Sequence, residues 1–335
     1  MGAMKDWGIR GCLAAVMFGF AYAAGPATAQ TQWDMYFAWP PGNLHTEGGE
    51  RFAKRVKEAT GGEVEIVVHP GSSLGLKGPE VMAAVRDGIV PIADMAVQQQ
   101  SGEVPFLSFA AMPGLASGFD ETRILMDVAR PYAEKIFKQY NQKLLYTAVW
   151  PGQGIYAKRP IKSVADLKGL KIRTSDKSST DYFALLGASP ILLPWAEVVP
   201  ALASGVIEGV TTSSQSGVDG KFPEFMDYFT PVNWANPINM VTVNLDTWNE
   251  LKPEHQAAIE KIAKEMEAEL WRVSRELDDA NLKTLTDGGM EVVDPSPEFL
   301  RDLAASAAPL WDAYVKQAGP NAAAMIKEFR EKAGK

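Results

Sequence analysis

The sequence predicts an α/β protein of two domains that are braced by one long helix. Three observations lead to this prediction. The chain has 335 residues, more than a typical single domain contains. Strand-like and helix-like apolar spacings alternate along most of it. A run of about 33 residues from Pro253 to Leu285 has no glycine and no further proline, and its apolar positions recur at helical spacing.

Residues 1–29 have the pattern of a secretion signal. Lys5 and Arg10 provide positive charge before an apolar run. A small-x-small cleavage motif follows this run and ends at Ala29. An uncleaved N-terminal anchor is the alternative. The single cysteine, Cys12, lies inside this segment, so the mature chain is expected to have no disulfide and no thiolate. No later apolar run is long enough to span a membrane, and we expect a periplasmic location.

The first half of the chain alternates strands and helices in the order expected for a largely parallel sheet. The first helix is expected to end at Thr60-Gly61-Gly62, where glycine allows a C-cap. Pro131 is expected to break or kink a later helix at 121–142. The predicted strands are 32–39, 63–70, 92–97 and 143–150, and the other predicted helices are 44–60 and 78–89.

A second unit begins after the turn that follows Trp150. Ser163 and Asp166 have the spacing of a capping-box variant at the start of a short helix. Strands are predicted at 170–174, 189–193 and 208–213, with helices at 178–188 and 194–207. We expect one domain to contain 30–149 plus about 239–278, and the other to contain 150–238 plus about 279–335.

Composition and motifs exclude several function classes. The net charge is −8 and no basic stripe is present, so nucleic acid is not an expected partner. The sequence contains no phosphate-binding glycine loop and no hydrolase nucleophile motif. His45, His69 and His255 do not follow a metal-ligand spacing. We therefore predict no catalytic residue, no metal site and no cofactor.

Arg173 is the main candidate for ligand binding. The segment "LKIRT" places it at the carboxyl end of a predicted strand, where open α/β sheets bind ligands. A guanidinium at that position can hold a carboxylate through two parallel hydrogen bonds. A structural ion pair with a neighbouring acid is the alternative, and the sequence does not decide between them.

Aromatic residues gather at predicted junctions between strands, loops and helices. Large aromatic side chains at such positions can line a cleft between two α/β domains, although core packing is the alternative for Trp195. Tyr156, Gln98, Gln99 and Gln100 are weaker candidates for the same cleft. The tryptophans at these junctions are Trp39, Trp150, Trp195 and Trp234.

Several segments resemble one family. The run "PIKSVADLKGLKIRT" at 160–174 resembles the signature of the solute-binding proteins of tripartite ATP-independent periplasmic (TRAP) transporters. Segments 193–213, 52–75 and 248–265 are similar to further blocks of that family in the same order. The resemblance implies a periplasmic binding protein fold whose two domains close over a small organic carboxylate. It implies no catalysis, and delivery of the ligand to the integral membrane permease subunits.

The resemblance also implies roles for individual residues. In this family the arginine equivalent to Arg173 clamps the ligand carboxylate, and the aromatic residue equivalent to Trp195 touches the ligand. Thr212 and Ser213 stand where a polar residue follows a strand. Gln153 occupies the place where many members carry a second arginine, which favours a monocarboxylate. Members that bridge a keto acid through a metal use a Glu-Trp pair where this chain has "TTSS", which argues against a metal here.

The tryptophan-rich junctions favour an aromatic or bulky hydrophobic monocarboxylate as ligand. Keto, hydroxy and sugar acids bound by the same family are the alternatives. Two other function classes stay open from the sequence. One is a periplasmic acid–base enzyme that uses Glu208 or Asp176 in the same cleft. The other is a binding protein for an ATP-driven importer.

Overall fold

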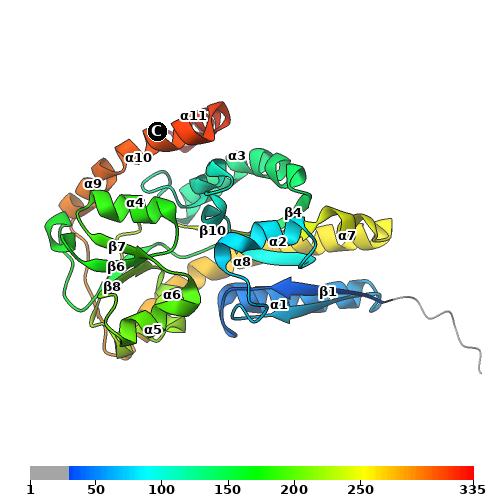
Figure 1. The fold of residues 1–335 in the computed structure, drawn as a ribbon, viewed down its shortest axis with the longest axis horizontal. Coiled ribbons are helices and arrows are strands. Elements are labelled where there is room, and N and C mark those ends of the chain that lie inside the picture. The colour runs from blue at the N-terminus through cyan, green and yellow to red at the C-terminus, as the bar shows by residue number, and fades with distance from the viewer. Residues whose placement is uncertain (1–29) are drawn as a thin grey trace, which may run out of the picture.

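The computed structural model describes residues 30–335, which form two mixed sheets with helices on their faces (Figure 1). The predicted α/β fold with two domains is confirmed. The predicted secretion signal at 1–29 lies outside the described residues. Within 30–335, no helix is both long and apolar enough to cross a membrane.

The first sheet has the strand order β2-β1-β3-β10-β4. Its first three strands are parallel, as predicted, but β10 lies antiparallel between β3 and β4. This antiparallel strand makes the sheet mixed. β10 joins the sheet from far along the chain. The strands are β1 (Thr31–Tyr36), β2 (Val64–His69), β3 (Ile92–Ala96), β4 (Gln142–Val149) and β10 (Ile238–Asn244).

The helices of this domain begin and end where local chemistry requires. Helix α1 (Leu44–Ala59) starts at Asn43, whose side chain accepts a hydrogen bond from the His45 N–H at 2.8 Å. It ends at the predicted C-cap, where Gly62 has a φ of 84° and its N–H donates to Lys57 O at 2.8 Å. The other elements are η1 (Gly78–Glu80), α2 (Val81–Arg86), η2 (Val97–Gln100), η3 (Pro105–Ala111), α3 (Gly118–Gln139) and α7 (Leu245–Asn249).

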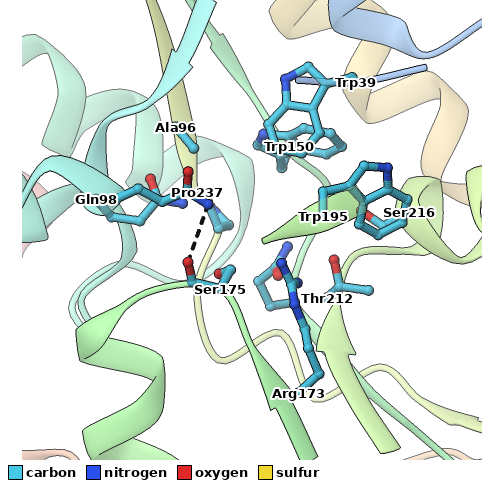
Figure 2. Close-up of a pocket in the computed structure, with 12 residues that line it drawn as sticks. Trp39, Ala96, Gln98, Trp150, Arg173, Ser175, Trp195, Thr212, Ser216 and Pro237 are labelled. Carbon is cyan, nitrogen blue, oxygen red and sulfur yellow. Dashed lines mark hydrogen bonds between the residues drawn. The ribbon is translucent and has the colours of Figure 1, made fainter. Parts of the chain in front are cut away.

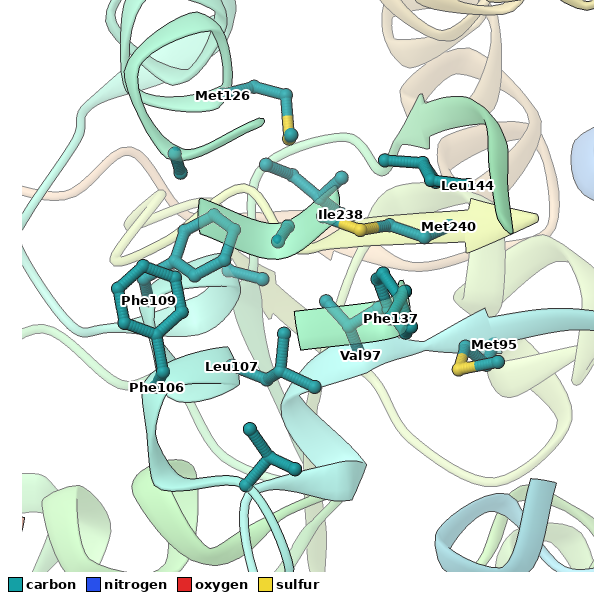
Figure 3. Packing of buried hydrophobic residues seen from close by; sticks show 14 of the residues in the cluster. Met95, Val97, Phe106, Leu107, Phe109, Met126, Phe137, Leu144, Ile238 and Met240 are labelled. Carbon is teal, nitrogen blue, oxygen red and sulfur yellow. The ribbon is translucent and has the colours of Figure 1, made fainter. Parts of the chain in front are cut away.

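Both faces of the first sheet are buried. Neighbouring residues of a strand point to opposite faces, so Met240 of β10 packs in one hydrophobic cluster and Val241 in the other. Figure 3 shows the cluster that contains Met240, in which Met95 and Phe137 also take part. Burial on both faces explains why β3 reads as an apolar run interrupted only by Asp94.

Helix α3 continues through Pro131, so the helix does not break there, and the alternative of a kink stays a prediction. Proline removes one backbone hydrogen bond, but packing offsets this cost. Leu125, Ala129 and Phe137 of the same helix are buried in the cluster shown in Figure 3.

The second sheet has the order β11-β9-β5-β8-β6-β7. The predicted capping box is confirmed, since Asp166 accepts a hydrogen bond from the Ser163 N–H at 2.9 Å. Sequence reasoning missed β5, β9 and β11, which are short. The elements are β5 (Gly154–Ala157), η4 (Val164–Leu167), β6 (Lys171–Thr174), α4 (Lys177–Leu185), β7 (Ser189–Leu192), η5 (Trp195–Glu197), α5 (Val198–Ala203), β8 (Gly209–Thr212), α6 (Ser214–Asp219), η6 (Phe222–Glu224), β9 (Tyr228–Thr230) and β11 (Glu291–Val292).

Helix α8 (Pro253–Asp287) is the predicted long brace. Its 35 residues span about 52 Å at a rise of about 1.5 Å per residue. It packs against α1 and β4 of the first domain and against α6 of the second. Figure 1 shows it running from one domain to the other, so the bracing role is confirmed.

The C-terminal helices return across the molecule. Helix α9 (Pro297–Ser306) packs in the second domain through Phe299 and Leu303. Helices α10 (Ala308–Ala318) and α11 (Pro320–Ala333) pack against η3 and α3 of the first domain. The sequence-based boundaries placed all of 279–335 in the second domain. We propose instead that α10 and α11 be assigned to the first domain, on the basis of their packing.

Candidate ligand-binding site

A small cavity of about 30 Å³ lies between the two domains (Figure 2). The first domain supplies residues from β3, from η2 and from the segment after β1. The second domain supplies residues from β6, η5, β8 and α6, and the segments that connect the sheets supply the rest. The lining residues are Trp39, Ala96, Gln98, Gln99, Trp150, Gln153, Arg173, Ser175, Trp195, Thr212, Ser216 and Pro237.

The parallel strands β6 and β8 bring two polar residues to the same sheet edge. Arg173 of β6 lies opposite Val210 of β8 in the register, so Thr212 emerges just beyond it. Both side chains therefore lie at the carboxyl ends of their strands, where α/β sheets bind ligands. Helix α6 begins directly after β8 and packs closely there, because a Cβ on Gly217 would lie only 2.2 Å from the Tyr156 hydroxyl oxygen. This close packing places Ser216 at the cavity.

Arg173 is a buried cation that is 3% exposed. Its Nε donates to Leu193 O at 3.0 Å, and the guanidinium forms no ion pair with any carboxylate of residues 30–335. Burial lowers the pKa of Arg173 to about 10, while the nearby Asp176 opposes this effect. Arg173 thus forms no direct salt bridge, and its role as the ligand clamp rather than as a structural partner of Asp176 stays a prediction. A ligand carboxylate would supply the missing counter-charge.

Three tryptophans line the same cavity. The rings of Trp39 and Trp150 meet edge to face, with centroids 4.7 Å apart and planes at 75°. Figure 2 shows these two indoles on one side of the cavity and the Arg173 guanidinium opposite them. Trp195, at the start of η5, is half-buried and forms part of a third side. The cavity thus combines one cation with large apolar rings.

Glutamines supply neutral polar groups. Gln98 is 4% exposed, and its Oε1 has no hydrogen-bond partner among the described residues. Gln153 is also buried, and its Nε2 makes only a long contact of 3.4 Å with Pro151 O. Gln99 Nε2 donates to Ser175 O at 3.2 Å, which links the two domains directly at the cavity (dashed in Figure 2). These amides can donate to or accept from a ligand without adding charge.

Besides Gln100, three predicted site residues do not line the cavity. Ser213 is the N-cap of α6 and accepts a hydrogen bond from the Ser216 N–H at 3.3 Å. Tyr156 is fully buried and donates to Ser213 O at 3.0 Å. Trp234 packs in the second domain, where its Nε1 donates to Thr211 Oγ1 at 2.8 Å. These residues hold the strands and helix behind the cavity.

Four lining residues were not singled out from the sequence. Ser175 comes directly after the strand that contains Arg173 and Thr174, and Ser216 lies in the serine-rich run after β8. Both could have been predicted from their position beyond the end of a strand. Ala96 and Pro237 carried no chemical signal. Their place in the lining follows from the pairing of β3 with β10, which the local sequence does not reveal.

A larger cavity of about 650 Å³ adjoins the first. The two share Trp39, Gln99, Ser175 and Trp195, so these four residues separate the inner cavity from the outer one. Lys77 Nζ lies 3.6 Å from Glu197 Oε1 across the outer cavity, which also joins the two domains.

The carboxylates considered for an acid–base enzyme do not line the inner cavity. Glu208 is about half exposed near Lys171. Asp176 is the N-cap of α4 and accepts a hydrogen bond from the Ser179 N–H at 3.0 Å. Within residues 30–335, no three His, Cys, Asp or Glu side chains gather in a way that could hold a metal ion.

Comparison with known proteins identifies the family. Residues 37–317 match the model of the bacterial extracellular solute-binding protein family 7, DctP. The crystal structure of DctP6 from Bordetella pertussis, an extracytoplasmic solute receptor binding pyroglutamic acid, is 33% identical with a TM-score of 0.88 and covers 90% of this chain and 100% of its own. A TRAP solute-binding protein specific for pyroglutamate from a marine metagenome is also 33% identical, with a TM-score of 0.86, and covers 90% and 99%.

A curated relative has a related description. The monocarboxylate 2-oxoacid-binding periplasmic protein of Nostoc sp. is 29% identical over 81% of this chain and 75% of its own length. The family match covers most of the described residues and agrees with the two-domain fold around an arginine-containing cavity. The chain therefore belongs to the DctP family of bacterial extracellular solute-binding proteins, the non-enzymatic solute receptors of TRAP transporters.

Proposed function

We propose that this receptor captures pyroglutamate, or a cyclic monocarboxylate of similar size, and delivers it to the membrane subunits of a TRAP permease. The observation that carries the proposal is the buried Arg173, which faces a small cavity and forms no direct salt bridge with a carboxylate of residues 30–335. Two related receptors with a similar fold bind pyroglutamate, which supports the same ligand class here.

The charge of the lining favours a ligand with one carboxylate. Arg173 is the only charged residue among those that line the inner cavity. Gln153, which stands where many family members carry a second arginine, contributes a neutral amide. A dicarboxylate would leave its second charge without a cationic partner in a buried site, which is costly. A lactam acid has one carboxylate and a neutral polar edge that amides can satisfy.

The size of the cavity favours a small ring over the bulky aromatic acid suggested by the tryptophans. Its volume of about 30 Å³ is small beside the outer cavity of about 650 Å³. A larger acid must move lining side chains, open the domains or extend into the outer cavity, and the displacement grows with ligand size. A 2-oxo acid is the second candidate, because its small size and single carboxylate also fit and a curated relative binds such acids.

A binding screen tests this proposal. Purified mature protein is titrated with pyroglutamate, pyruvate, benzoate and galacturonate by calorimetry and by thermal denaturation. Ligand that binds only the native state raises Tm. We expect the tightest binding and the largest rise in Tm with pyroglutamate. The proposal is wrong if pyruvate, benzoate or galacturonate stabilises the protein and pyroglutamate does not.

A further inference from the structure

Buried residues hold the indole nitrogens of Trp39 and Trp150 from behind. Trp39 Nε1 donates to Asp94 Oδ1 at 2.8 Å, and Trp150 Nε1 donates to Asn239 Oδ1 at 2.8 Å. Asn239 Nδ2 also donates to Asp94 Oδ1, at 2.6 Å. Asp94 and Asn239 therefore join the two rings into a single network, which we call the indole network.

The indole network lies on two paired strands of the first sheet. Asp94 lies in β3 and Asn239 in β10, and these strands are neighbours in the middle of the sheet. The two side chains are 2% and 0% exposed. A carboxylate and an amide in otherwise apolar central strands cost desolvation energy. Their hydrogen bonds to the tryptophans offset this cost and fix the orientation of both rings.

The network also places negative charge behind one side of the cavity. His45 Nδ1 lies 3.7 Å from Asp94 Oδ2, too far for a hydrogen bond, and the His45 ring packs against Trp150 with ring centroids 4.1 Å apart. Aromatic faces already carry negative potential, and a carboxylate that accepts the indole N–H makes the ring more electron-rich. Arg173 lies on the opposite side of the cavity (Figure 2).

We propose that Asp94 and Asn239 are positioning residues that make the tryptophan side of the cavity electronegative. The cavity then selects monocarboxylates that carry an electropositive ring N–H beside the carboxylate, where it can approach the tryptophan side. This inference rests on the proposed function and narrows its ligand class. A lactam ring presents such an N–H, whereas the same ring with oxygen in place of nitrogen presents lone pairs, which the electronegative side disfavours.

The test compares two matched ligands. Pyroglutamate has a ring N–H where its lactone analogue, 5-oxotetrahydrofuran-2-carboxylate, has a ring oxygen. The two ligands are otherwise the same. Calorimetry on the wild-type protein is expected to give a Kd for the lactam about tenfold or more below that for the lactone. In Asp94→Asn, which keeps an acceptor oxygen but removes the charge, this ratio is expected to fall to about threefold or less. A purely structural role for Asp94 would not change the ratio.

Two further variants keep the test decisive. Asp278→Asn is the matched control, because Asp278 is a partly buried carboxylate that accepts from Ser214 Oγ at 2.6 Å and belongs to no tryptophan contact. It is expected to leave the ratio unchanged. Asn239→Ala releases Trp150 from the indole network while Asp94 remains, and is expected to lower the ratio as well. It decides the question if Asp94→Asn does not fold.

The outcomes separate this inference from the proposed function. A ratio that falls in Asp94→Asn or Asn239→Ala, but not in Asp278→Asn, supports the inference. If pyroglutamate binds the wild type and the ratio is the same in all variants, the inference is wrong and the proposed function stands. If the wild-type protein binds neither ligand, both are overturned.

Discussion

Arg173 is a buried cation that Leu193 O satisfies only in part, and this residue is where the function can be tested most directly. We expect Arg173→Ala to weaken ligand binding by about 100-fold, because the ligand carboxylate loses its counter-charge. Arg173→Lys should also weaken binding, since a point charge does not reproduce the bidentate fork. The ligand-free protein should change its free energy of unfolding by less than about 1 kcal/mol.

Calorimetry measures the affinities of these arginine variants, and urea denaturation measures their stability. Arg159→Ala is the matched control, because Arg159 is an exposed arginine of the same domain that donates to Asp166 O at 2.9 Å. It should leave binding unchanged. A loss of several kcal/mol in ligand-free Arg173→Ala would instead make Arg173 a structural residue.

Asp219 gives stability a predictable dependence on pH. Burial raises the pKa of Asp219, while hydrogen bonds from Asn43 and Gln215 oppose this shift. The native state then holds this proton to higher pH than the unfolded state, so the stabilising contribution is present at low pH and is lost as pH rises above about 4. Asp219→Asn should make the fall in stability above that pH shallower in denaturant titrations at a series of pH values.

A second aspartate provides a control of opposite sign. The Arg86 side chain lowers the pKa of the exposed Asp87. Asp87 therefore stabilises the native state above the ordinary range for aspartate, near about 4, and this contribution is lost as pH falls. Asp87→Asn should change how the free energy of unfolding varies with pH only below that range. If Asp219→Asn leaves the pH dependence above it unchanged, the assignment to Asp219 is incorrect.

Among the elements, α8 is attached to the first sheet by one buried carboxylate. Glu267 of α8 accepts from the Thr147 N–H at 2.8 Å and pairs with Arg130 and Arg123. We expect Glu267→Ala to lower the free energy of unfolding by about 2 kcal/mol, because it leaves the buried Thr147 N–H unpaired and removes one of the two carboxylates that Arg130 and Arg123 each contact.

Urea denaturation compares Glu267→Ala with Glu265→Ala in the same helix. Glu265 is exposed and lies 3.9 Å from Arg55, so its removal should change stability by less than about 0.5 kcal/mol. Equal effects of the two variants would show that Glu267 does not anchor α8.

Some features of the helices and strands can be predicted from the local sequence. The long helix, the capping box at Ser163 and the C-cap at Gly62 follow from spacing and residue type, and all three are present. The insertion of β10 between β3 and β4 depends on pairing between segments about 145 residues apart, as between Asn239 and Asp94. No local pattern encodes such a pairing.

The residues of the candidate site also fall into those that the local sequence predicts and those that it does not. Arg173 and Thr212 were predictable because strand ends face the cleft in α/β sheets. Pro237 enters the cavity only through the long-range arrangement. Trp234 and Tyr156 have the residue type of a cleft lining, but both side chains pack in the core of the second domain, Tyr156 from β5 and Trp234 from the segment between β9 and β10.

For the whole molecule, closure of the two domains over a ligand should control how fast the ligand leaves. Gln99 Nε2 donates to Ser175 O at 3.2 Å, and this bond crosses between the domains where the inner cavity meets the outer one. We expect Gln99→Ala to raise the dissociation rate of pyroglutamate several-fold, because the closed form loses a direct contact, and to change the association rate much less.

Stopped-flow tryptophan fluorescence can measure both rates, since three tryptophans line the cavity. Lys77→Ala is the control for a contact between domains that does not touch the inner cavity. Lys77 and Glu197 are exposed and 3.6 Å apart, and such pairs contribute little in water. Its dissociation rate should stay within about twofold of wild type. Equal dissociation rates for Gln99→Ala and the wild type would mean that closure is held elsewhere, most directly by the ligand bridging Arg173 and the tryptophans.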